Sequence, residues 1–157
     1  MAEAVQPPAH QHEPFAHRIA FNVIPQVGVF AKGDHPQSTE ELALALDVAR
    51  VLPKAPVVRA TALHVPTFHG VTLCVHGQLE TGVEVAALRE LFKTSPRVKL
   101  LDSPSESIYP MPMLATSDDA VHIGRVRTLG THFWAMLTLD NAGLVAGAGV
   151  QLALAMR

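Results

Sequence analysis

The sequence is poor in cysteine and in charged residues. Cys74 is the only cysteine among the 157 residues, so no disulfide can form within the chain. This cysteine usage suits a reducing compartment, and we expect a cytoplasmic protein. Charged residues make up only 17% of the chain and the formal net charge is -2. That balance lacks the basic surface typical of proteins that bind nucleic acids or anionic membranes, so neither partner is expected.

No long uninterrupted apolar run is present either. The most apolar stretch, residues 133–156, is broken by Asp140, Asn141 and Gln151, whereas a membrane span needs about 20 predominantly apolar residues. The first residues are rich in proline, histidine and polar groups, and they lack the cationic start and apolar centre of a secretory signal. We therefore expect the stretch 133–156 to be buried in protein rather than in lipid.

What the chain does contain is hydrophobic material, which makes up 48% of it. This length and composition are typical of one domain with a substantial core. Residues 1–17 differ from the rest, because Pro7, Pro8 and Pro14 prevent regular backbone hydrogen bonding there. We therefore predict a flexible tail over 1–17 and one domain over 18–157.

Capping signals and apolar periodicity predict three helices. Ser38 followed by Glu41 forms a capping box, and Pro53 ends the helix that this box starts. A second helix is predicted over 83–94, with an apolar stripe along one side. A third, rich in glycine and alanine, is predicted over 143–156. Its small residues allow another backbone to approach closely, so it either packs on its own sheet or waits for another protein.

Alternating and β-branched residues predict the strands, and Gly130 predicts the turn between the last two. The predicted strands span residues 57–65, 71–80, 97–101, 121–127 and 132–139. This order of helices and strands favours an α+β domain with a mixed, mostly antiparallel sheet and helices on one face.

One face of this predicted sheet has no helix to cover it. Alternation places apolar side chains on at least two strands, and a large exposed apolar patch usually marks an interface. A homodimer with the sheets face to face is the simplest closed arrangement. The residues predicted to lie in that dimer interface are Val71, Leu73, Val75, Phe133, Ala135 and Leu137.

Four segments resemble the C-terminal domain of aspartate-semialdehyde dehydrogenases. They are residues 18–28 (RIAFNVIPQVG), the acidic helix start at 39–41, YPMP at 109–112 followed by VHIGRVR at 121–127, and FWAMLTLDN at 133–141. Their order and spacing match over nearly all of the chain that follows the predicted tail. The resemblance implies the fold of a glyceraldehyde-3-phosphate-dehydrogenase-like C-terminal domain and a role in dimerisation.

For a complete member of that family, the resemblance implies an enzyme of amino-acid biosynthesis that uses NADP to interconvert aspartyl phosphate and aspartate semialdehyde. Its N-terminal half is a Rossmann-type domain with a glycine loop and a cysteine nucleophile. The present chain has no G-x-G-x-x-G after a strand. Cys74 lies within a predicted strand, where we expect it to be packed. No cofactor is therefore expected in this chain, and NADP enters only through the resemblance.

The positions at which the family acts on its substrate are replaced here. The resemblance places an arginine, for the substrate carboxylate, at His64 and a histidine, for proton transfer, at Val71. Histidine cannot reproduce the planar fork of a guanidinium, and valine cannot carry a proton. His69 remains an open alternative for the base. We therefore predict no catalytic residue in this chain.

Two weaker candidates remain at the family's ligand positions. Glu40 matches an acidic residue that grips the substrate, but the lysine three residues later is Ala43. Asn141 matches the cofactor side of the family's site, but the lysine-glycine helix start expected after it is missing. A structural role is open for both, because an acidic residue favours the start of a helix and asparagine is a common cap.

Nine histidines raise the question of a metal site. His64 and His76 could share a sheet face, yet the sequence offers them no clear carboxylate partner, so no metal site is predicted. Arg125 and Arg127 alternate on a predicted strand and should share a face. An anion site is compatible with this spacing, although an ion pair, solvated or at an interface, is favoured.

These observations predict a homodimerisation domain that is not a working dehydrogenase by itself. Two alternatives stay open. The chain could be a fragment or split half of an aspartate-semialdehyde dehydrogenase that needs a separate Rossmann-domain chain. It could also be a regulatory subunit that forms heterodimers with an active paralogue.

Overall fold

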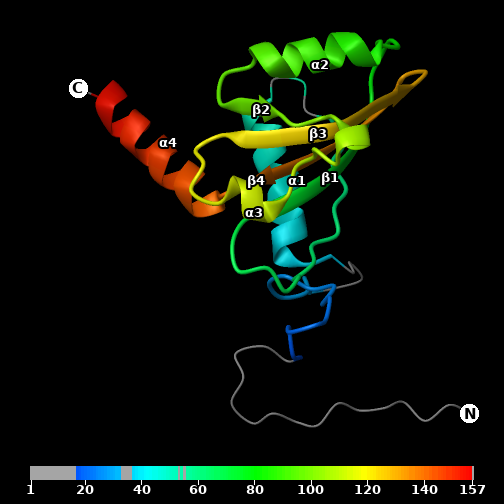
Figure 1. Cartoon of the computed structure of the whole chain (residues 1–157). Helices are drawn as coiled ribbons and strands as arrows, with labels where there is room; N and C mark the ends of the chain where they lie inside the picture. The colour runs from blue at the N-terminus through cyan, green and yellow to red at the C-terminus, as the bar shows by residue number, and fades with distance from the viewer. Residues whose placement is uncertain (1–16, 33–36, 53, 55, 157) are drawn as a thin grey trace, which may run out of the picture. The chain divides into compact units, whose positions relative to one another are not determined.

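The computed structural model of the protein describes residues 17–32, 37–52, 54 and 56–156. The described residues form two compact units, which divide between Pro66 and Thr67 (Figure 1). The domain predicted over 18–157 therefore spans two units. The predicted tail lies outside the described residues except for His17.

The first unit is built around helix α1 (Thr39–Val51). The predicted capping box is confirmed, since Ser38 Oγ accepts from the Glu41 amide and Glu41 Oε2 accepts from the Ser38 amide at 2.8 Å. The other carboxylate oxygen of Glu41 accepts from the Ala62 amide, also at 2.8 Å. The Ala62 and Ser38 amides together hold the pKa of Glu41 below its ordinary value. One side chain thus fixes both the helix start and the segment around Ala62.

The strand predicted over 57–65 is wrong. Within the first unit only an isolated bridge forms there, in which Ile24 and His64 exchange backbone hydrogen bonds of 2.9 and 3.0 Å. Pro56 and Pro66 bracket the segment and cannot donate to a ladder. The Ala62 amide bonds to the Glu41 carboxylate instead of to a strand.

The second unit contains a four-stranded sheet in the order β1-β4-β3-β2. The strands are β1 (Val71–Gln78), β2 (Val98–Leu100), β3 (Val121–Leu129) and β4 (His132–Leu139). Only the β2–β3 pair is parallel. Gly130, at φ 58°, turns β3 into β4 as predicted. The predicted α+β class with a mixed, mostly antiparallel sheet is confirmed.

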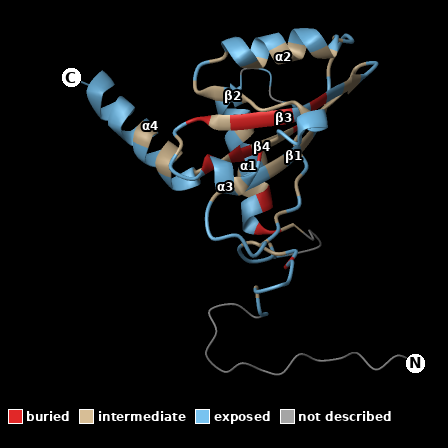
Figure 2. Cartoon of the chain, viewed as in Figure 1, coloured by how far each residue is buried: buried red, intermediate tan, exposed pale blue. Residues whose placement is uncertain are grey.

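Helix α2 (Val85–Thr94) covers one face of this sheet. Its Val85, Leu88 and Phe92 recur at spacings of three and four, which places them on one side of the helix. They pack against a buried cluster of strand residues, which consists of Ile123, Val126 and Ala135. Figure 2 shows that burial concentrates along β3, while the outer side of α2 is exposed. Arg89 on α2 donates to the buried carboxylate of Asp102 at 2.7 Å and so ties the helix to the end of the sheet.

This packing bears on the predicted dimer interface. Ala135 belongs to the buried cluster and Leu137 packs against it, so both side chains face the core of their own chain, which argues against the predicted place of these two residues in a dimer interface. The paired positions of β1 and β4 put the rest of the predicted set on the same covered face, namely Val71, Leu73, Val75 and Phe133. Alternation correctly grouped these residues, but the face they form is the one that α2 covers.

The opposite face is closed at one end by the connection between β2 and β3. This connection includes a 3-10 turn (Pro104–Glu106) and helix α3 (Pro112–Ala115), which contacts β4. Pro110, Ala115, His122 and Thr138 are all buried in this region. A side-chain carbon added at Gly124 would lie 2.7 Å from Pro110 and 1.9 Å from the Leu101 carbonyl oxygen. Glycine at 124 therefore lets the connection close on the sheet.

Helix α4 (Asn141–Ala155) ends the described chain. It begins two residues before the predicted start at 143, because Asp140 caps it. None of its residues is buried, and Val145, Val150, Leu152 and Leu154 are exposed. Within the described parts of the chain, no helix has both the length and the apolar character that crossing a membrane requires.

Candidate functional site

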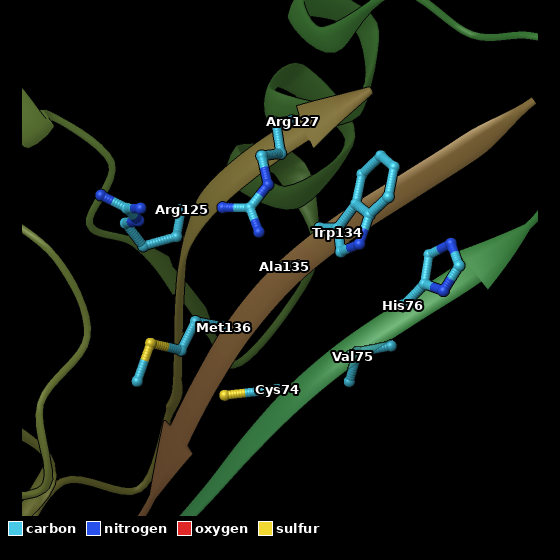
Figure 3. Close-up of a pocket in the computed structure, with 8 residues that line it drawn as sticks. All are labelled: Cys74, Val75, His76, Arg125, Arg127, Trp134, Ala135 and Met136. Carbon is cyan, nitrogen blue, oxygen red and sulfur yellow. The ribbon is translucent and has the colours of Figure 1, made fainter. Parts of the chain in front are cut away.

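The part of the sheet opposite α2 that remains open is formed by side chains from β1, β3 and β4. Directly paired residues share a face, and the pairs here are Cys74 with Met136, and Trp134 with both His76 and Arg127. Together with Arg125 they line a hollow of about 360 Å³ (Figure 3). We call this set the open face: Cys74, His76, Arg125, Arg127, Trp134 and Met136.

A β-bulge brings both arginines onto the open face. Gly124 pairs with Met136 and Arg127 with Trp134, so Arg125 and Val126 together stand opposite the single residue Ala135. Arg125 takes the left-handed backbone conformation at φ 55°. Val126 points into the core while Arg125 lines the hollow. The predicted sharing of a face by Arg125 and Arg127 is confirmed, and the bulge decides that the face they share is the open one.

Trp134 organises the side chains around it. The His76 ring stacks on it at 4.7 Å between centroids with 9° between planes, and the Arg127 guanidinium carbon lies 5.7 Å from its ring centroid. Figure 3 shows Trp134 between Arg127 and His76. Next to this stack, His76 Nε2 and His132 Nδ1 are 3.1 Å apart while their ring centroids are 5.2 Å apart. The two imidazoles therefore meet edge to edge, as a hydrogen bond between a donor and an acceptor nitrogen requires.

The open face is positively charged and has no acidic residue. None of the strands β1 to β4 contains aspartate or glutamate. Asp118, on the connection between β2 and β3, already accepts from Lys99 and His122. Within the described structure, neither the Arg125 nor the Arg127 guanidinium donates a hydrogen bond or joins an ion pair. The ion pair favoured from the sequence therefore does not form among these residues.

The residues predicted from the family's substrate site are divided between the two units. Glu40 is exposed in the first turn of α1, and His64 is half-buried in the bridge to Ile24. Val71 is the first residue of β1 in the second unit. His69 also lies in the second unit, near enough to Asp140 to lower the pKa of that carboxyl slightly, after larger effects of backbone amides. Each of these positions is thus defined only within its own unit.

Asn141, the predicted cofactor residue, is the exposed first residue of α4, and its neighbour Asp140 is the cap. Asp140 Oδ1 accepts from the Ala142 and Gly143 amides at 3.1 Å, and Oδ2 accepts from the Ser117 amide at 3.0 Å. The Ser117 amide, and then that of Gly143, keep the pKa of Asp140 below its ordinary value.

A dinucleotide would need those helix amides for its pyrophosphate. At α4 the chain's own carboxylate occupies them, and at α2 the residue before the helix is Glu84. The turns from β1 into α2 and from β4 into α4 therefore each carry an acidic side chain that opposes an anionic ligand. The described residues do not fit a dinucleotide cradle.

Cys74 corrects a second sequence-based expectation. It lies on β1 as predicted, but it is exposed on the open face rather than packed. The cluster of His76, His132 and Trp134 was missed altogether. In the sequence, this cluster is indicated only by the alternation of His76, His132 and Trp134 with apolar residues such as Val75 and Ala135. The register between β1 and β4 is needed to show that the three side chains come together. Among the described residues no group of three or more histidine, cysteine or acidic side chains could hold a metal ion, and the absence of a metal site stays a prediction.

Comparison with known proteins identifies the family and supports the fold of this chain. The family described as "Semialdehyde dehydrogenase, dimerisation domain" matches residues 2–141. The chain is 30% identical over 113 residues to the aspartate-semialdehyde dehydrogenase of Campylobacter jejuni, covering 72% of this chain and 32% of that protein. It is 31% identical over 139 residues to that of Bacillus subtilis, covering 84% and 38%. The chain thus spans about a third of the length of these curated relatives.

Solved structures of aspartate-semialdehyde dehydrogenases resemble this chain in their fold. A probable aspartate-semialdehyde dehydrogenase from Pseudomonas aeruginosa matches with a TM-score of 0.78 and 25% identity, over 91% of this chain and 43% of that one. An aspartate semialdehyde dehydrogenase II from Vibrio cholerae matches with a TM-score of 0.79 over 91% and 44%, and at 21% identity it shows the fold alone.

Proposed function

This chain belongs to the family of semialdehyde dehydrogenase dimerisation domains, and on that premise we propose that it self-associates through the open face of its sheet. A second copy is the proposed occupant of that face. The contact would be isologous, with the same patch presented by both copies.

One observation supports this choice of face. The sheet buries one side under α2, whereas the other side presents Trp134, Met136, Arg125 and Arg127 around a hollow. Tryptophan, methionine and arginine are enriched in protein interfaces, and tryptophan and arginine dominate their energetic hot spots. A half-covered sheet of this composition fits a self-association surface better than a solvated one.

The test is the solution mass of the chain across a dilution series, measured by light scattering after size exclusion. We expect a mass near twice 16.8 kDa, and we expect Trp134→Arg or Met136→Arg to shift it toward the monomer. Leu91→Arg is the matched control, because Leu91 is 57% exposed on α2, on the other side of the sheet. A monomer at all concentrations, or equal effects of Trp134→Arg and Leu91→Arg, would contradict the proposal.

The chain alone is proposed to be catalytically silent. Histidine at 64, alanine at 43 and valine at 71 stand where the resemblance implies arginine, lysine and histidine. The position of Cys74 supports this, because the thiol is exposed on the open face, which self-association would cover. The assay is NADP-dependent turnover of aspartate semialdehyde by the isolated chain, with the Bacillus subtilis relative as positive control. Measurable turnover by the isolated chain would overturn this part of the proposal.

A second candidate function is a subunit that works with another chain, and α4 is the feature that favours it. This helix is apolar around its circumference and has no buried residue, and such helices are usually covered. The partner would be a separate Rossmann-domain chain, with NADP bound there, or an active paralogue. Mixing this chain with a complete relative and following subunit exchange by native mass spectrometry tests the paralogue case.

The single exposed thiol suits a reducing cytoplasm, which we propose as the location.

A further inference from the structure

The open face concentrates positive charge that the chain does not neutralise. Arg125 and Arg127 both line the hollow, and neither has a carboxylate partner among the described residues. His76 and His132 lie beside them. No acidic residue occurs on any of the four strands. Both arginines are exposed in a single copy, where water solvates them, so a counter-charge becomes necessary when a partner covers this face.

Self-association cannot supply that counter-charge from the same face. In an isologous contact each copy presents the patch that the other presents. A second open face would bring two further arginines and no carboxylate. Two such faces would repel each other more strongly as water leaves the contact. An additional anionic component resolves this conflict.

We propose that the open face binds a small dianionic oxyanion between Arg125 and Arg127, and that this anion links the two copies. The inference rests on the proposed self-association function and names the ligand class that completes it. Guanidinium groups recognise oxyanions through paired hydrogen bonds, which a chloride ion cannot accept in the same way.

The geometry of the two arginines supports such a site. The Arg127 guanidinium lies over the Trp134 ring, which orients it, and no described protein acceptor engages its N–H groups. Arg125 is directed to the hollow by a bulge that holds its backbone at φ 55°. Strained backbone of this kind persists at binding sites because the surrounding structure enforces it. Both donors are therefore placed before any ligand arrives.

Trp134 provides a direct assay, because it is the only tryptophan in the chain. Inorganic phosphate is titrated at about pH 8, where it carries two negative charges, against sodium chloride at equal ionic strength. We expect a saturable change in tryptophan fluorescence with phosphate and none with chloride. Succinate in a third titration tests whether two carboxylates can replace the tetrahedral anion.

The same solutions are then compared by light scattering. Phosphate should lower the dimer dissociation constant about tenfold or more relative to chloride, as expected for new charge-assisted hydrogen bonds. Arg125→Gln and Arg127→Gln should remove both the fluorescence change and the phosphate dependence. Arg127→Lys, which keeps the charge but loses the planar fork, should retain only part of the fluorescence change and of the phosphate dependence. Lys93→Gln on α2 is the control and should behave as the unmodified chain.

The outcomes separate this inference from the function on which it rests. Equal dimerisation in phosphate and chloride, without a phosphate-specific fluorescence change, overturns the anion site while self-association stands. A phosphate-specific fluorescence change in a chain that remains monomeric overturns the linking role and the proposed function together, but leaves the oxyanion site. Fluorescence changes that survive in both glutamine variants overturn the assignment to Arg125 and Arg127.

Discussion

The two faces of the sheet are built from the same strands, yet they differ in what covers them. On one face Ile123, Val126 and Ala135 are buried under α2. On the other, Trp134 and Met136 stand beside arginines and exposed residues of β1. On β4 both faces contain large apolar side chains, so hydrophobicity along that strand does not distinguish them. The comparison teaches that a helix, rather than the strand pattern, decides which face becomes the core.

Ile123→Ala is expected to show the largest contrast between the faces. Ile123 is 4% exposed in the core cluster, so its truncation leaves a cavity and should lower the free energy of unfolding by about 2–5 kcal/mol. Met136→Ala on the open face should cost less, because its side chain is already half-exposed in a single copy. Urea unfolding at a protein concentration at which the chain is monomeric measures both values. Equal losses would mean that the faces are not distinguished by packing.

The same contrast explains how far the sequence could predict this molecule. Ser38 and Glu41 act locally, so their capping box and the helix it starts were predictable, as was the turn at Gly130. The strand over 57–65 failed because forming a strand depends on a partner, and the Glu41 carboxylate engages the Ala62 amide instead.

Less of the candidate site than of the local structure could be predicted from the sequence. Alternation grouped Leu73, Val75, Ala135 and Leu137 correctly, but it contains no information on which face α2 covers. The meeting of His76 with Trp134 depends on the register between β1 and β4. The bulge at Arg125 follows from no local propensity, because arginine does not favour positive φ. These features are set by tertiary packing.

Gly124→Ala tests the closed end of the face opposite α2. The added carbon would lie 1.9 Å from the Leu101 carbonyl oxygen, and backbone must move to admit it. We expect a loss of about 1–3 kcal/mol in the free energy of unfolding. Gly149→Ala on α4 is the control, because no atom lies within 4 Å of the added carbon and alanine is favoured in helices by about 1 kcal/mol. Thermal or urea unfolding should therefore give opposite signs for the two variants.

Asp118→Asn tests how that closed end is held at different pH. Asp118 Oδ2 accepts from Lys99 Nζ at 2.5 Å and from His122 Nε2 at 2.8 Å. Lys99 first, and then His122, lower the pKa of Asp118 from 3.8 to about 2. The carboxylate therefore stabilises the fold fully above pH 3.8, and this contribution is lost as the pH falls through about 2.

The expected loss for Asp118→Asn near neutral pH is about 1 kcal/mol, because Lys99 is largely solvated. Unfolding curves of the variant and the unmodified chain should converge as the pH approaches about 2. Glu90→Gln is the matched control, since Glu90 pairs with Lys93 on the exposed side of α2 and should change stability by only a few tenths of a kcal/mol. A difference for Asp118→Asn that persists unchanged into acid would rule out this role of the carboxylate.

The smallest expected effect on stability, at Arg125, has the opposite sign and separates stability from function. Left-handed backbone costs an L-residue about 1–2 kcal/mol, and Arg125 adopts it at φ 55°. Arg125→Gly should therefore raise the free energy of unfolding, by less than about 1 kcal/mol once the larger entropy loss of glycine is included. Arg127→Gly is the neighbouring control and should lower it, because Arg127 is outside the positive-φ set and loses its contact with Trp134. If both variants weaken self-association in phosphate while their stabilities move in opposite directions, then the bulge maintains strain that presents Arg125 to the anion. If both stabilities move the same way, the strain does not reside at this residue.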